Sequence, residues 1–178
     1  MIIRISLTAL FAALTAAGAF IAIPIGPVPI VLQNFFALLS GLILGPLLGS
    51  AAVGLYLIAG ILNFPVFAGA AGGIARFAGP TGGYLPGYLL AALSAGIIAG
   101  KPRLSYTSPL PRIIAAAAVG LLVIYIPGLL WLKISGKLDW TKTLLAGFIP
   151  FLPGDVLKGI AAVIIAPRLR RTAAGYIN

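Results

Sequence analysis

Long apolar runs, separated by short segments rich in proline and glycine, make up most of this sequence of 178 residues. Only 8% of the residues are charged, whereas charged residues make up about a quarter of an average water-soluble domain. Such a chain cannot cover a globular surface with polar side chains. The solvent around most of it must therefore be lipid, and the sequence predicts a multi-pass integral membrane protein.

Proline and glycine divide the apolar sequence into six segments. A helix needs roughly 20 residues to cross a bilayer, so the chain has room for about six spans and short loops. We expect an all-α bundle that forms a single domain over residues 1–178, with structured outer loops. The predicted spans are approximately 5–23, 32–44, 48–62, 84–99, 113–132 and 143–166. The first has the length of a span, so we interpret it as a retained helix and not as a signal peptide.

The twelve lysines and arginines orient this bundle, because cytoplasmic loops are enriched in basic residues. With the N-terminus inside, the cytoplasmic side receives Arg4, Lys101, Arg103, Arg112, Arg168, Arg170 and Arg171, the outer side receives Arg76, Lys133, Lys137 and Lys142, and Lys158 lies in the last span. Both termini are therefore predicted to be cytoplasmic. The net charge of +10 then records topology and does not indicate a nucleic-acid partner.

The inventory of reactive side chains argues against an enzyme. The chain has no histidine and no cysteine, and its only acids are Asp139 and Asp155. The commonest general base and the usual metal ligands are thus missing, and we expect neither a catalytic residue nor a metal site. A self-sufficient carrier or channel stays open as an alternative. It would need a polar path across the whole membrane, whereas the last segment continues as the apolar IAAVIIA.

Asp155 and Lys158 stand inside an otherwise apolar stretch, PFLPGDVLKGIAAVII. Ionisable residues within a membrane cost on the order of 3 kcal/mol each on insertion scales and are by default functional candidates. Their spacing of three places both on one face of a helix. Two interpretations remain open: the pair is a self-neutralising structural feature, or it binds a ligand with a donor-rich part and an acidic part.

Three segments are predicted to come together on the outer side: the proline-rich turn PIGPVPI after the first span, the glycine-rich loop before the fourth, and the start of the sixth. Other candidate ligand contacts lie on the same side. Arg76 lies in the glycine-rich GGIARFAGPTGGY and is either an ordinary loop arginine or a fork for a carboxylate. The amides Gln33, Asn34 and Asn63 stand at outer span ends, where they can contact a ligand or cap a helix. Flat apolar surface is offered by Tyr84, Phe64, Phe67, Phe77 and Trp140, although most aromatics at this level are interfacial anchors or core.

The first segment carries a stripe of small residues, Ala9, Ala13 and Ala17, at intervals of four. Small residues at this spacing let another helix approach closely within lipid. That helix is either a neighbouring span of the same chain or part of a partner protein.

These features together resemble a known family. The motifs that carry the resemblance are GPVPIVLQ (26–33), GLILGPLLG (41–49), FPVFAGAAGG (64–73), GPTGGYLPGY (79–88) and PGDVLK (153–158). In this order on six spans, the chain resembles the biotin-specific substrate-binding subunits (BioY-type S-components) of energy-coupling factor (ECF) transporters. The resemblance implies a protein of the prokaryotic cell membrane that binds biotin on its outer side and has no cofactor or ATPase activity of its own.

The resemblance also implies partners and roles. A transmembrane coupling subunit and two cytoplasmic ATPase subunits are expected, with Ala9, Ala13 and Ala17 on the docking face. Asp155 is expected to accept hydrogen bonds from the ureido N–H groups of biotin. Lys158 and Arg76 face the ureido oxygen or the carboxylate in an order left open, and Asn63, Gln33 and Tyr84 are further candidates. The residues alone indicate only a small carboxylate-bearing or zwitterionic ligand, so another vitamin of this kind is the alternative.

Overall fold

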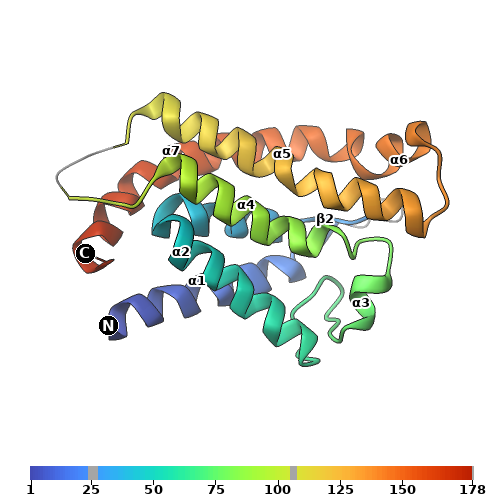
Figure 1. Cartoon of the computed structure of the whole chain (residues 1–178), viewed down its shortest axis with the longest axis horizontal. Coiled ribbons are helices and arrows are strands. Elements are labelled where there is room, and N and C mark those ends of the chain that lie inside the picture. The colour runs from blue at the N-terminus through green and yellow to red at the C-terminus, as the bar shows by residue number, and fades with distance from the viewer. Residues whose placement is uncertain (24–27, 105–107, 178) are drawn as a thin grey trace.

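The computed structural model of the chain describes residues 1–23, 28–104 and 108–177, which are mostly helical (Figure 1). The helices are α1 (Ile2–Phe20), α2 (Gln33–Ile61), α3 (Ala75–Ala78), α4 (Tyr84–Ala99), α5 (Leu110–Ser135), α6 (Trp140–Gly147) and α7 (Leu152–Ile177), with a 3-10 turn at Ile149–Phe151 and the strands β1 (Ala22–Ile23) and β2 (Ile30–Val31). By length and hydropathy, four stretches of the described chain are long enough to cross a membrane, namely Ile2–Phe20, Gln33–Ile61, Leu110–Ser135 and Trp140–Ile177; Tyr84–Ala99 is a shorter apolar helix.

The two predicted spans at 32–44 and 48–62 form one helical element, α2, which is sharply kinked at Gly45. Gly45 has φ 81° and ψ −177°, a conformation that glycine adopts without steric cost. The Oγ of Ser40 donates to the carbonyl oxygen of Gly49 at 3.1 Å, and the amide of Gln33 donates to the hydroxyl of Tyr56. The second pair would lie about 35 Å apart in a straight helix. The chain therefore folds back at Gly45, and the two arms of α2 pack side by side.

Close packing without large side chains joins this hairpin to α4. A Cβ added at Gly41 would overlap the backbone oxygen of Ala92, and one added at Gly96 would lie 2.6 Å from the Cα of Pro46. Ala91, Ala92 and other alanines of α4 are completely buried. Helices in lipid associate through such small residues. Large apolar side chains gain little by exchanging contacts with lipid tails for contacts with one another, so close packing of the backbones contributes more.

Two predicted spans have different bounds in the structure. Residues 21–23 leave the helix, because Ala22 and Ile23 pair antiparallel with Val31 and Ile30 in a short β-ribbon, so the fold is not purely helical. The first half of the predicted proline-rich turn, 24–27, lies outside the described residues. The predicted last span at 143–166 is divided into α6, the 3-10 turn and α7, and α7 continues to Ile177.

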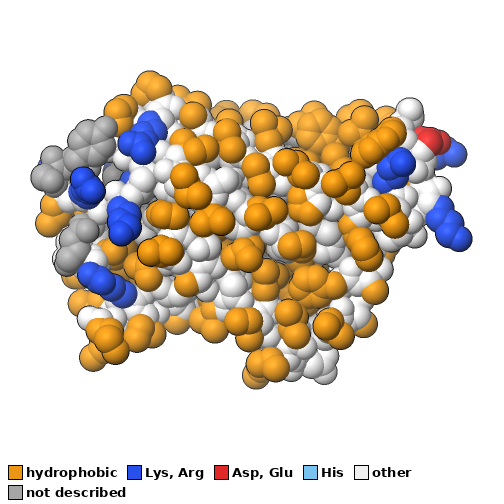
Figure 2. Space-filling view, viewed as in Figure 1, with side chains coloured by type: hydrophobic (Ala, Val, Ile, Leu, Met, Phe, Trp, Pro, Cys, Tyr) orange, Lys and Arg blue, Asp and Glu red, His pale blue; other side chains and the backbone are white. Residues whose placement is uncertain are grey.

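The two ends of the bundle differ from its middle. Figure 1 shows both chain termini at one end and the short helices α3 and α6 at the other. In Figure 2, Lys and Arg side chains gather at both ends, while the visible face between them is mostly apolar. Large apolar side chains of α5 and α7, such as Leu122, Ile126 and Ile164, are each more than half exposed. This distribution is that of a protein whose middle faces lipid.

Arg170, which was predicted to lie on the cytoplasmic side, is buried at the end that carries the termini. Its guanidinium donates to the backbone oxygens of Ala99 and Gly100 at 3.0 Å, to Ser108 at 3.1 Å and to the backbone oxygen of Leu42. The backbone oxygens among them lie at the C-terminal ends of α4 and of the first arm of α2. A cation is favourable there because of the helix dipole and the unpaired carbonyls.

The alanine stripe on α1 faces outward. Ala9, Ala13 and Ala17 are exposed, whereas Ala12 and Ala19 are buried against the rest of the chain. Packing of α1 within the chain therefore uses the opposite face, and the stripe remains available to another helix.

Two glycines of α2 test the tight packing. Gly41→Ala should lower the free energy of unfolding by about 1–3 kcal/mol, because backbone atoms must move to admit the methyl group. Gly54→Ala, in the second arm of α2, is the matched control, since a Cβ there meets nothing within 4 Å. It should leave stability unchanged or raise it by up to about 1 kcal/mol through helix propensity. Thermal unfolding in detergent measures both, and equal effects would contradict the packing described here.

Candidate ligand-binding site

A cavity of about 500 Å³ lies at the end of the bundle away from the chain termini. Its wall combines the segment after α1, the start of α2, the glycine-rich connection around 67–81, the start of α4, part of α5 and the start of α7. The predicted convergence of the proline-rich turn, the glycine-rich loop and the last helix is thus observed for the described residues. The volume falls within the range of roughly 300–1,000 Å³ that is typical of small-molecule sites.

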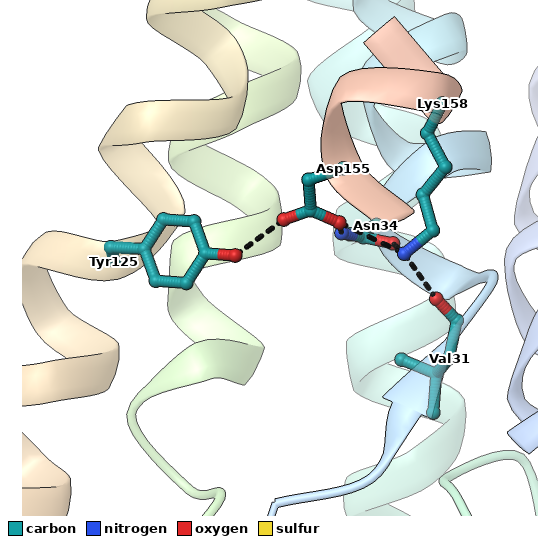
Figure 3. A network of polar contacts seen from close by, with 5 residues as sticks. All are labelled: Val31, Asn34, Tyr125, Asp155 and Lys158. Carbon is teal, nitrogen blue, oxygen red and sulfur yellow. Dashed lines mark hydrogen bonds and ion pairs between the residues drawn. The ribbon is translucent and has the colours of Figure 1, made fainter. Parts of the chain in front are cut away.

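Asp155 is the only acid of the cavity, and its carboxylate is held from two sides (Figure 3). Oδ1 accepts hydrogen bonds from Asn34 Nδ2 and Lys158 Nζ, both at 2.9 Å. Oδ2 accepts one from the hydroxyl of Tyr125 at 2.5 Å. Asp155 is 6% exposed, so these donors replace the water that an ionised carboxylate otherwise requires.

Lys158 completes the network. Its ammonium donates to Asp155, to Asn34 Oδ1 and to the backbone oxygen of Val31, each at 2.9 Å. Three donations use every hydrogen of the ammonium. The network also determines which way the amide of Asn34 points, because a carboxylate only accepts and an ammonium only donates. Four segments of the chain, namely β2, α2, α5 and α7, therefore meet around one ion pair.

Arg76 supplies a second cation from another part of the wall. It lies on α3, lines the cavity and is exposed. Both acids of the chain are described, and each pairs with a lysine: Asp155 with Lys158 at 2.9 Å and Asp139 with Lys142 at 3.5 Å. The cavity thus contains one carboxylate and two cations. This imbalance suits a ligand with a single negative charge.

Aromatic rings form much of the remaining wall. Two of the predicted aromatics, Phe67 and Tyr84, line the cavity together with Tyr88, Tyr125 and Phe151. Tyr84 is anchored by its hydroxyl, which donates to the backbone oxygen of Gly147 at 2.8 Å.

The other predicted aromatics lie elsewhere. Phe77 packs edge-to-face behind Phe67, with ring centroids 6.0 Å apart. Phe64 and Trp140 are at least half exposed and outside the wall.

The structure brings most, but not all, of the predicted site residues together. Gln33, Arg76, Tyr84, Asp155 and Lys158 all line the cavity, and the amide of Gln33 is buried and bonded to Tyr56. Asn63 does not line it.

Asn63 instead ends α2. Its φ of 72° lies in the left-handed region, and its backbone N–H donates to Gly60. Asparagine is one of the few residues apart from glycine that adopt this conformation readily. Asn63 therefore serves to turn the chain after α2.

Sequence reasoning did not single out Tyr125 and considered Asn34 only as one of three amides. A signal for both existed: each is a polar side chain in an apolar segment, and a buried tyrosine hydroxyl usually has a hydrogen-bond partner. That partner could not be identified from the sequence, because Tyr125 and Asn34 are separated from Asp155 by 30 and 121 residues.

Fold and cavity together define a helical membrane protein with a cavity sized for a small molecule. A model of the BioY family matches residues 2–175, and the chain belongs to this family. A probable biotin transporter BioY of Pyrococcus horikoshii is 46% identical over 94% of this chain and 96% of its own length. The biotin transporter BioY of Thermotoga maritima is 40% identical over 91% and 92%, respectively.

A solved structure agrees with these relatives. The crystal structure of the S-component for biotin from an ECF-type ABC transporter superposes with a TM-score of 0.85 at 31% identity, covering 96% of this chain and 92% of that one. The family resemblance predicted from the motifs is therefore confirmed.

Because Asp155 and Lys158 are partners in one network, the stability losses caused by replacing each of them should not be additive. Asp155→Leu and Lys158→Met should each destabilise the protein by about 3 kcal/mol, because each leaves a buried charge without its partner. The double variant should lose clearly less than the sum of the two. Thermal unfolding in detergent without added ligand tests this, and strictly additive losses would show that the two charges do not depend on each other.

Proposed function

We propose that this chain binds biotin in the cavity described above and serves in its uptake as the S-component of an ECF-type transporter. The observation that carries the proposal is the arrangement of charge: a hydrogen-bonded Asp155–Lys158 pair in one wall and Arg76, without an acidic partner, in another. Biotin combines a ureido group, an apolar ring system and a carboxylate, which match the ion pair, the aromatic wall and the second cation. The names of the relatives and of the solved S-component support the same ligand.

The hydrogen-bond inventory favours one assignment of the two cations. The three hydrogens of Lys158 are engaged within the network, whereas both acids available to Arg76 are paired with lysines. Arg76 is therefore the proposed partner of the biotin carboxylate, for which a guanidinium offers two parallel donors. Asp155 accepts from one ureido N–H group, and Lys158 and Asn34 lie near the ureido oxygen.

The proposed topology has six spans in one domain. The two arms of α2 count as separate spans beside α1, α4, α5 and the unit formed by α6 and α7. Both termini lie at one end of the bundle (Figure 1), and the positive-inside rule assigns this end to the cytoplasm. The cavity then opens outward from the cell membrane of a prokaryote.

Transport requires partners under this proposal. The chain is a transporter component and not an enzyme, as its family indicates. A transmembrane coupling subunit and two cytoplasmic ATPase subunits supply the energy, so that ATP is used by the partners and this chain needs no cofactor. The exposed stripe of Ala9, Ala13 and Ala17 is the proposed docking face for the coupling subunit.

The two ends of the ligand can be tested separately. Arg76→Gln should weaken biotin binding about tenfold, as expected for loss of a charged hydrogen bond, but should hardly change binding of biotinamide, which lacks the carboxylate charge. Asp155→Asn should weaken binding of both. Equilibrium titration of the purified chain in detergent measures these affinities.

Lys142→Gln is the matched control, because Lys142 is an exposed cation that does not line the cavity. It should leave both affinities unchanged. Absence of biotin binding to the folded parent would overturn the proposed function, and equal losses for biotin and biotinamide in Arg76→Gln would overturn the role of Arg76.

A further inference from the structure

We infer that Tyr125 is a positioning residue for ligand recognition: its hydroxyl orients the carboxylate of Asp155 so that a single acceptor position remains for the ligand. The inference rests on the proposed function and deepens it. Tyr125 comes from α5, whereas Asp155 lies on α7 and the other partner of its carboxylate, Asn34, on α2, so this assignment depends on how three helices pack (Figure 3).

A count of donors and acceptors leads to this inference. A carboxylate offers roughly four acceptor positions, two on each oxygen. Asn34 and Lys158 occupy those of Oδ1, and Tyr125 occupies one of Oδ2. The remaining position is on Oδ2, beside the tyrosine hydroxyl. Because Asp155 lines the cavity, this is the position at which a ligand N–H can be received.

The ring of Tyr125 is held independently of its hydroxyl. It packs edge-to-face on Phe148 with centroids 4.7 Å apart and on Tyr84 with centroids 6.3 Å apart. The oxygen therefore reaches Asp155 from a preorganised ring and loses little freedom when it donates. Removing the oxygen leaves these ring contacts in place, so that the effect of the hydroxyl can be measured by itself.

Without the hydroxyl, the carboxylate is restrained through Oδ1 alone. It can then turn about the bond to Cβ, and Oδ2 has two positions to fill instead of one. A ligand N–H meets an acceptor whose direction is no longer defined. Tyr125 thereby acts on the ligand through Asp155, and its effect should disappear when Asp155 no longer carries a charge.

A double-mutant cycle tests this dependence, because only residues that act together give non-additive effects. Tyr125→Phe should weaken biotin binding at least tenfold in the parent, as expected for loss of a hydrogen bond to a charged group. In the Asp155→Asn background, the same change should weaken binding less than about threefold. Titration of the full chain in detergent, extended to millimolar biotin for the weak variants, measures all four affinities.

Tyr84→Phe provides the comparison. It also removes one hydroxyl from the cavity wall, but this hydroxyl donates to the backbone of Gly147 and not to Asp155. Its effect, whatever its size, should be the same in both backgrounds. Size-exclusion elution and thermal unfolding show which variants are folded.

A second measurement does not need the Asp155 variant. Desthiobiotin keeps the ureido group and lacks the sulfur, so the ratio of its affinity to that of biotin reports on the apolar wall. Tyr125→Phe should weaken both ligands equally and leave this ratio unchanged. A changed ratio, or a tenfold loss that persists with Asp155→Asn, would overturn the inference and make Tyr125 a simple wall residue.

The outcomes for the two proposals differ. If the folded parent binds biotin and Tyr125→Phe binds it equally well, the proposed function stands and the positioning role fails. If the folded parent does not bind biotin, both are overturned.

Discussion

Two opposite charges lie inside a bundle that faces lipid, and the need to surround them with partners shapes this end of the molecule. Within a membrane no bulk water satisfies a carboxylate or an ammonium. Asp155 and Lys158 neutralise each other, but the remaining donors and acceptors must come from elsewhere in the chain. Val31, Asn34 and Tyr125 supply them from three other segments. The ion pair thus joins the β-ribbon, α2, α5 and α7 into the wall of a cavity.

The opposite end of the bundle also contains a buried charge, but this charge is stabilised by backbone oxygens and not by an ion pair. Arg170 is buried there without an acid, and its guanidinium is surrounded by the backbone oxygens at which two helices end. Helix ends carry partial negative charge and unpaired carbonyls, so a single arginine can bring α4, α7 and the kink of α2 together. Between these two ends, Gly41, Gly96 and the alanines of α4 let the helices touch at backbone distance.

This asymmetry is consistent with ligand capture at one side of the membrane. The ligand-sized cavity lies beside the ion pair, and beyond Lys158 the buried residues of α7 are Ala162 and Ala166 until Arg170 is reached. A continuous polar path across the bundle is not seen among the described residues. Under the proposed function, release of a bound ligand on the other side of the membrane requires a larger rearrangement, and the exposed alanine stripe of α1 is the proposed face for the partner that drives it.

Much of this organisation follows from local rules, and those parts were predictable. The scarcity of charge determines the solvent. Gly45 and Pro46 end one helical arm and begin the next, because glycine accepts a positive φ and proline cannot continue the preceding helix. The spacing of Asp155 and Lys158 places them on one face, because residues three apart are neighbours on any helix. The sequence by itself therefore determined the membrane setting, the break at Gly45 and the polar pair in the last helix.

Other features depend on contacts between residues far apart in the chain, and only the tertiary structure decided them. Asn34 and Tyr125 join the site because helix packing brings them to Asp155, whereas Asn63, an equally plausible amide, turns the chain outside the cavity. Arg170 is buried because α7 continues past its predicted end to meet two other helix ends. Periodicity specifies which residues share a face. Which faces meet is determined by the packing of small residues and by the pairing of every buried polar group, and neither can be derived from one segment alone.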